Sequence, residues 1–165
     1  MPVKSATAKG MDVQMKDYAQ LAHQNFKRVY NCAQAVACAF SEELNLEEAQ
    51  IARLVSSFGG GMGKLRQVCG AVSGALFVLG ALKGYSDPAA TDEKAAHYAR
   101  VQAFARRFKA EHETIVCREL LKGVSLQKEH TPAPEARTDD YYRVRPCVRF
   151  VETAARIAGE MLAEE

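Results

Sequence analysis

The segment FGGGMGKLRQVCGAVSGALFVLGALKGY (residues 58–85) contains the central loop and helix of the fold predicted from this sequence. It opens with four glycines within residues 59–63, and each glycine costs about 1 kcal/mol relative to alanine inside a helix. The cluster therefore predicts a loop. The apolar residues 68–82 that follow predict a buried helix, because a membrane-spanning helix needs about 20 apolar residues.

Small residues mark one face of this predicted helix. Gly70 and Gly74 are four positions apart and so share a face, which allows a second helix, a cofactor or another copy of the chain to approach closely. The glycine cluster does not match a phosphate-binding P-loop, because Phe58 and Leu65 stand where glycine and serine or threonine are required. Its backbone amides remain suited to a small anion.

Composition and length set the class of protein. The chain has 165 residues and a formal net charge of +2, which predicts one domain with a sizeable core and no nucleic-acid partner. Residues 1–10 predict a flexible leader and residues 11–165 the folded domain. No apolar signal-peptide core follows the N-terminus, so we expect a cytoplasmic protein without a membrane segment. Cysteines in that compartment favour metal or redox chemistry over structural disulfides.

On both sides of the central segment, helical spacing and capping residues predict an all-α, single-domain bundle of about seven helices. Convincing strand alternation is absent from the sequence. Residues 127–145, rich in charge and without periodicity, predict a long loop. The predicted helix starts, besides the central one, are Asp12, Asn31, Asn45, Asp87-Pro88, Thr114 and Pro146.

Four of the five cysteines fall at predicted helix N-termini: Cys32, Cys69 in the first turn of its helix, Cys117 and Cys147. The partial positive charge and free amides at a helix start favour the thiolate, which is the reactive and metal-binding form. Cys69 has the strongest case for a lowered pKa. Cys38 lies in mid-helix and is predicted to be a core residue with a raised pKa. The sequence has no C-x-x-C pair, so a shared site would take one thiolate from each of four helices.

These cysteines and their surroundings resemble a known family. Cys32, the CGAVSG of residues 69–74, Cys117 in CRELL and Cys147 in PCVRFVETAARI are similar to the pattern of the C_GCAxxG_C_C family of small prokaryotic proteins described as redox-active. The resemblance covers most of the chain and implies a cysteine-based redox or metal site. A similar four-cysteine domain occurs in split-Soret cytochromes c, but this chain has no C-x-x-C-H and covalent haem is not expected.

Three functions remain open at this stage. The first is electron transfer by a [2Fe–2S] cluster held by Cys32, Cys69, Cys117 and Cys147, with an unknown redox partner. The second is thiol–disulfide chemistry with Cys69 as nucleophile, and the third is an interaction module with a structural zinc ion on the same four cysteines. The glycines expected to cover the cofactor are Gly59, Gly60, Gly61, Gly63 and Gly70.

Overall fold

The computed structural model describes residues 16–165, so the predicted leader (1–10) and the predicted helix start at Asp12 lie outside the described residues. Within residues 16–165 the chain forms ten α-helices, one short 3₁₀ helix and no β-strand. The all-α prediction is therefore confirmed, and the predicted number of helices is too low. The elements in chain order are α2 (Tyr18–Lys27), α3 (Cys32–Cys38), α4 (Ser41–Leu44), α5 (Glu48–Leu54), η1 (Ser56–Phe58), α6 (Gly59–Met62), α7 (Gly70–Lys83), α8 (Thr91–His112), α9 (Cys117–Leu120), α10 (Asp139–Val144) and α11 (Cys147–Glu164).

The first extra helix comes from a break in the segment 31–44. Asn31 caps α3 as predicted, through a capping box, but the segment divides into α3 and α4 around Phe40. Asn45, predicted to start the next helix, instead ends α4 with a φ of 53°. Asparagine tolerates this left-handed conformation, so it can end a helix as well as start one. Glu47 caps α5 in its place.

Three further boundaries differ from the prediction. Thr114, predicted to start a helix, lies before α9, which begins at Cys117 after Val116. Asp87 forms a turn in which its carboxylate accepts from the amide of Ala89 at 2.9 Å, and α8 begins only at Thr91. The predicted loop 127–145 contains α10, which Thr138 caps by accepting from the amide of Tyr141 at 3.1 Å. A helix of six residues is too short to show a periodic apolar pattern.

Helix α7 forms the centre of the bundle and packs against α3, α8 and α11. Its small-residue face lies on α3: a Cβ added at Gly74 would stand 2.5 Å from the carbonyl oxygen of Ala33. The face predicted for internal packing, a cofactor or a dimer seam is therefore covered by α3 at this position. Phe104 and Phe108 of α8 close the core from the other side, with no exposed surface.

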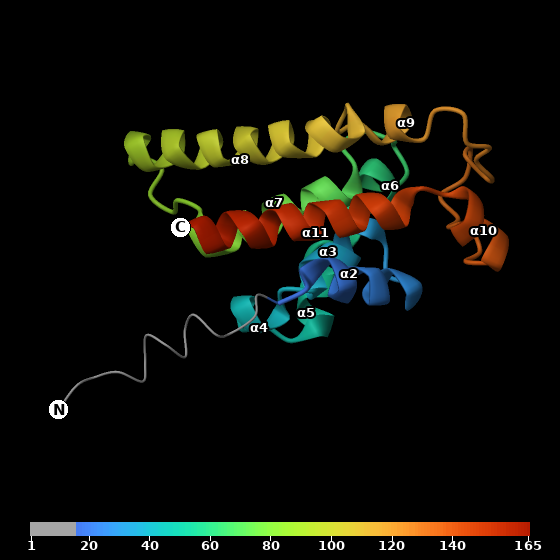
Figure 1. The fold of residues 1–165 in the computed structure, drawn as a ribbon, viewed down its shortest axis with the longest axis horizontal. Coiled ribbons are helices and arrows are strands. Elements are labelled where there is room, and N and C mark those ends of the chain that lie inside the picture. Colours follow the sequence, from blue (N-terminus) through green and yellow to red (C-terminus); the bar gives the residue numbers. More distant parts are fainter. Residues whose placement is uncertain (1–15) are drawn as a thin grey trace.

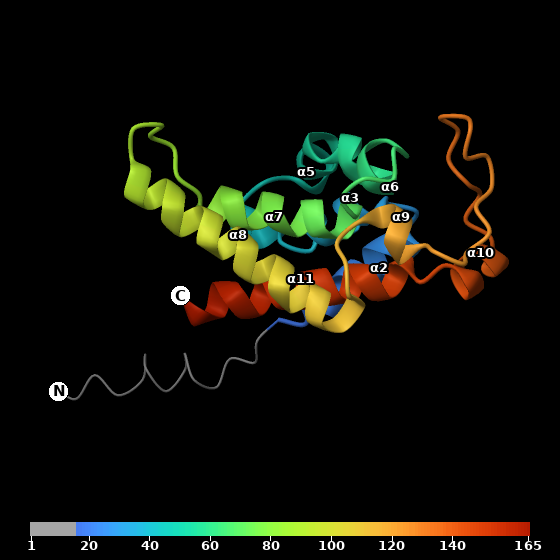
Figure 2. The same ribbon diagram turned by 90° about the horizontal axis from the view of Figure 1, so that it is seen from above.

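The helix directions bring several helix starts to one end of the bundle. Figures 1 and 2 show α7 and α11 beginning at the same end, beside α6, α9 and α10, whereas α8 runs the opposite way. The segment 121–138, which we call the covering loop, connects α9 to α10 at this end. Among the helices of residues 16–165, none has both the length and the apolar composition required to cross a membrane.

Candidate functional site

Four of the five cysteines line one cavity at this end of the bundle. Cys32, Cys69, Cys117 and Cys147 surround a space of about 80 Å³, and about 10–15 Å³ is enough for one water molecule. Cys38 lies elsewhere in the core, where its thiol donates to the carbonyl oxygen of Glu48 at 3.6 Å. The other residues lining the cysteine cavity are Asn31, Gly60, Gly61, Arg66, Gly70, Leu120, Leu121, Arg137, Tyr141, Arg145 and Phe150.

Each of these four cysteines stands at a helix start. Cys32 is the first residue of α3, directly after the capping residue Asn31. Cys117 and Cys147 are the first residues of α9 and α11. Cys69 is the N-cap of α7 rather than a residue of its first turn, because α7 begins at the following residue, Gly70.

Backbone hydrogen bonds place two of the cysteines next to each other although they are far apart in sequence. The amide of Cys69 donates to the carbonyl of Ile115 at 2.8 Å, and the amide of Cys117 donates to the carbonyl of Gln67 at 2.6 Å. The segment before α7 is thereby paired with the segment before α9. This pairing fixes the relative positions of the two helix starts and of their sulfur atoms.

The glycine-rich turn lies against the cysteines, as the sequence predicted it would. Gly60 and Gly61 have φ values of 67° and 70°, so the segment called α6 is not a right-handed helical turn and the predicted loop describes it correctly. These values lie in the left-handed region, which glycine adopts without steric cost. A Cβ at Gly61 would stand 2.7 Å from the Cβ of Cys117, so the turn touches the site.

The glycines expected to cover a cofactor divide between two spaces. Gly60, Gly61 and Gly70 line the cysteine cavity. Gly59 and Gly63 line a neighbouring hollow outside it.

Three arginines also line the cysteine cavity, and among the described residues no carboxylate lines it. Arg66 is only 5% exposed; it donates to the sulfur of Cys117 at 3.7 Å and to Glu129 at 3.0 Å. Arg145 is 7% exposed and donates to Glu135 at 2.6 Å. Both glutamates belong to the covering loop, so the loop is tied to the site through ion pairs in which each arginine is buried and each glutamate partly buried.

The third arginine, Arg137, comes from the covering loop itself. Its guanidinium donates to the carbonyl oxygens of Phe26 at 3.0 Å and Tyr30 at 2.8 Å. Sequence reasoning missed Arg137 and Arg145, because both lie in the segment predicted to be a loop without further assignment. The one local signal was the position of Arg145, two residues before Cys147.

The thiols of Cys32 and Cys147 shift each other's pKa in opposite directions. The hydrogen bond from the Cys32 thiol, together with the charge of Arg145, lowers the pKa of Cys147 to about 7 although the residue is buried. The same hydrogen bond and burial raise the pKa of Cys32 well above its ordinary value. The pair therefore consists of one thiol that ionises readily and one that stays protonated.

The lowered pKa predicted for Cys69 is wrong for the protein without a metal. Burial raises the pKa of Cys69 to about 12, even though the amides of Val72 and Ala71 donate to its sulfur. Burial also raises the pKa of Cys38, to about 11, as predicted. Burial has the same effect on the pKa of Cys117, against the opposing influence of Arg66. Desolvation thus outweighs the helix start at Cys69 and Cys117.

The thiols are close, but they are not arranged as a ready-made metal site. Among residues 16–165 no group of three or more cysteine, histidine, aspartate or glutamate side chains is spaced to hold a metal ion. Their chemistry nevertheless suits a soft metal, because thiolates are the ligands that iron–sulfur clusters and zinc prefer.

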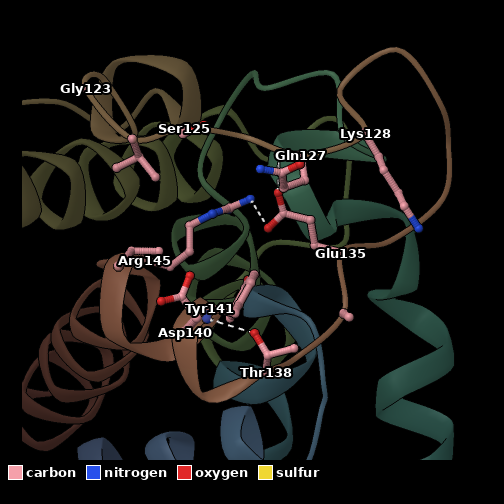
Figure 3. A pocket seen from close by; sticks show the side chains of 12 residues that line it. Gly123, Ser125, Gln127, Lys128, Glu135, Thr138, Asp140, Tyr141 and Arg145 are labelled. Carbon is pink, nitrogen blue, oxygen red and sulfur yellow. Dashed lines mark hydrogen bonds and ion pairs between the residues drawn. The ribbon is translucent and has the colours of Figure 1, made fainter.

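A larger hollow of about 580 Å³ adjoins the site (Figure 3). Tyr141 and Arg145 line both this hollow and the cysteine cavity. Figure 3 shows the ion pair between Arg145 and Glu135 along its wall, and the bond from the Tyr141 amide to Thr138 that starts α10. Tyr141 of α10 and Arg145, which follows α10, therefore lie at the boundary between this hollow and the cysteine cavity.

Comparison with known proteins gives one family. The model of the family described as "Putative redox-active protein (C_GCAxxG_C_C)" matches residues 30–161. Neither the curated proteins nor the solved structures gave a match to the chain. The matched range includes all four cysteines of the cavity and the covering loop.

Proposed function

The chain belongs to the C_GCAxxG_C_C family, which is described as redox-active, and on this basis we propose that its cysteine cavity is a redox centre that holds a [2Fe–2S] cluster or a similar metal centre for electron transfer. One observation carries the proposal. Four thiols from four helix starts meet around one cavity that also contains three guanidinium groups and, within residues 16–165, no carboxylate.

The positive charge of the three guanidinium groups suits an iron–sulfur cluster better than it suits four neutral thiols. Four thiolates are the usual ligand set of a [2Fe–2S] cluster, which when bound accepts and releases one electron at a time. Such a cluster carries net negative charge, and Arg66 and Arg145 are buried cations that would stabilise it. The N–H of Arg66 that already donates to the sulfur of Cys117 is the kind of bond that tunes the reduction potential.

The ligands in this proposal are Cys32, Cys69, Cys117 and Cys147. Since the sulfurs do not form a compact metal-binding group in this structure, metal loading has to draw them toward one another. A single zinc ion is the less favoured alternative, because all four sulfurs would have to come within about 2.3 Å of one point.

The test is anaerobic purification followed by an ultraviolet–visible spectrum and analysis of iron, sulfide and zinc. We expect a brown protein containing iron and sulfide, and loss of both when Cys69 or Cys117 is replaced by serine. Cys38→Ser is the matched control, since this buried cysteine lies outside the cavity. Colourless protein that stays free of iron after reconstitution would overturn the cluster, and stoichiometric zinc would favour the alternative.

A second candidate function rests on Cys32 and Cys147, which line the same cavity and have pKa values shifted in opposite directions. The thiolate of Cys147 would attack one sulfur of a substrate disulfide, forming a mixed disulfide and releasing the other sulfur as a thiol. Cys32 would then lose its proton and attack Cys147, releasing the second thiol. The substrate gains two electrons and two protons, and the protein is left with a Cys32–Cys147 disulfide.

This candidate differs from the earlier prediction of Cys69 as nucleophile. Cys147 has the pKa suited to attack near neutral pH, and Cys69 does not. Mass spectrometry of protein equilibrated with an excess of oxidised glutathione should then show a disulfide linking Cys32 and Cys147. Protein whose cavity cysteines remain reduced under these conditions would exclude the mechanism.

A further inference from the structure

A second hollow of about 400 Å³ lies beside the cysteine cavity, between the glycine-rich turn and the covering loop. We call this hollow the vestibule. Its volume lies within the range of about 300–1,000 Å³ typical of small-molecule sites. The residues that line both the vestibule and the cysteine cavity are Asn31, Gly60, Arg66, Arg137, Tyr141 and Arg145. A molecule in the vestibule would therefore lie directly beside the cysteines.

The vestibule is lined mainly by positive charge. Four basic residues line it, namely Lys64, Arg66, Arg137 and Arg145, and among its described lining residues Glu135 is the one carboxylate. A cleft with charges of one sign and poorly solvated walls concentrates ions of the opposite sign. The electrostatics of the vestibule therefore favour an anion.

Two of these cations are paired with carboxylates of the covering loop. Arg66 binds Glu129, and Arg145 binds Glu135. The Arg145–Glu135 pair is well buried, with side-chain exposures of 5% and 12%. An uncompensated charge there would be costly, so the arginine needs an anionic group beside it, and Glu135 supplies one in this structure.

The other two cations are held without a counter-charge among residues 16–165. The ammonium group of Lys64 donates to the carbonyl oxygens of residues 128, 131 and 133 at 2.7–2.8 Å, which fixes the covering loop over the vestibule. Arg137 donates to two carbonyl oxygens of the segment 26–30. Carbonyl groups satisfy these donors but do not cancel their charges, so the vestibule retains an excess of positive charge.

We propose that the vestibule is a binding site for a small molecule with a dianionic oxygen group, such as a phosphate, a sulfate or a phosphate monoester, and that Glu135 competes with this group for Arg145. Arg137 and Arg145 are the principal contacts. The ligand would lie beside the cysteine cavity and so within reach of the redox centre, and that part of the proposal rests on the proposed function. Anion binding itself does not depend on a metal.

The experiment is isothermal titration calorimetry on reduced, metal-free, full-length protein at constant ionic strength. Sodium sulfate tests for an inorganic ion, and phenyl phosphate tests for a phosphate carried by an organic molecule. We expect both to bind, with phenyl phosphate tighter if the natural ligand is organic. Since charge-assisted hydrogen bonds are the strong ones, Arg137→Met should weaken binding by about tenfold or more, while Arg137→Lys should recover part of the loss.

Glu135→Gln gives the sharper result, because it removes the competing charge. It should strengthen anion binding, whereas a purely structural role for the ion pair predicts weaker or unchanged binding. Arg107→Met, which breaks an exposed ion pair with Glu164 remote from the site, is the control and should change nothing.

A separate measurement on the wild-type protein tests the proposal even if the variants fail to fold. In the wild-type protein, phenyl phosphate should slow the alkylation of Cys147, and sodium chloride at equal ionic strength should not. Absence of calorimetric binding and of protection would overturn the proposal, as would equal effects of Glu135→Gln and Arg107→Met. Because the protein is metal-free in every arm, a failure to bind iron would leave these results unchanged.

Discussion

In the reduced, metal-free protein, Cys147 should be the first cysteine to react with a small disulfide reagent. Its pKa is lowered to about 7, whereas burial raises the pKa of Cys69 to about 12. Both thiols line the same cavity, so a reagent that reaches one has similar access to the other. A difference between the reaction rates of Cys147 and Cys69 therefore reports how far each thiol is ionised rather than how accessible it is.

The expected magnitude follows from the two pKa values. At pH 7 about half of Cys147 is thiolate, against about 10⁻⁵ of Cys69, a ratio of roughly 5 × 10⁴. The more basic thiolate is the stronger nucleophile, and a Brønsted coefficient of about 0.4–0.5 over this gap returns a factor of roughly 10²–10^2.5. Cys147 should thus react faster by ~10² or somewhat more.

The assay is time-resolved mass spectrometry of peptides after brief exposure to the reagent at several pH values. The rate at Cys147 should rise as pH increases through about 7 and then level off. Cys32→Ala removes the hydrogen bond that lowers this pKa, so the rise should move to higher pH. Cys38→Ala, which removes a buried thiol outside the cavity, should leave it unchanged. Labelling of Cys69 before Cys147 would contradict the prediction. So would a pH dependence of the Cys147 rate that is the same in the wild-type protein and in Cys32→Ala.

Three further predictions concern stability and the glycines. Raised pKa values at Cys38, Cys69 and Cys117 stabilise the fold below the unfolded thiol pKa, and this contribution is lost as pH rises toward the folded values. Urea denaturation of metal-free protein should therefore show stability falling above about pH 9, by up to about 1.4 kcal/mol per pH unit for each thiol, with a shallower fall in Cys38→Ala. Gly61→Ala should lower iron content or thiol reactivity, because its Cβ would stand 2.7 Å from that of Cys117. Gly63→Ala is the control, since Gly63 has a similar positive φ but its Cβ would have its nearest contact at 4.0 Å. Equal metal content in the two variants would show that the turn only connects its neighbouring elements. Gly74→Ala should destabilise the fold by about 1–3 kcal/mol through the clash with Ala33. Gly80→Ala is the control: its Cβ would have its nearest contact at 3.8 Å, so it should be neutral or stabilising by up to about 1 kcal/mol. Thermal unfolding of the two variants would measure both effects.

Features set by neighbouring residues could be predicted from the sequence. The capping box at Asn31, the end of α7 at Gly84 and the start of α11 after Pro146 follow from local hydrogen bonding and backbone restriction. The position of the cysteines at helix starts followed from the same local signals. Asn45 and Asp87 were exceptions. An asparagine can end one helix or begin another, and an aspartate can form a turn before a helix as well as cap it, so the sequence does not decide between these outcomes.

Features set by distant residues could not be predicted. Arg66 is joined to Glu129 across 63 positions, and a charged residue in a polar loop gives no sign of a buried partner so far away. The prediction of a lowered pKa for Cys69 was wrong for a related reason. The helix start favours its thiolate, but burial by the folded chain opposes it more strongly, and burial is a property of the whole fold.

The spacing of the CGAVSG segment has a physical explanation in the contact between α3 and α7. A Cβ at Gly70 would stand 2.8 Å from the carbonyl oxygen of Phe58 and 3.2 Å from the Cβ of Cys32. One turn later, Gly74 admits the backbone of Ala33 equally closely. The two glycines therefore set how near the start of α3 lies to the start of α7, and with it how near Cys32 lies to Cys69. A side chain at either position would push the two sulfurs apart. The close packing of α3 on α7 and the assembly of the cysteine cavity therefore both require glycine at these two positions.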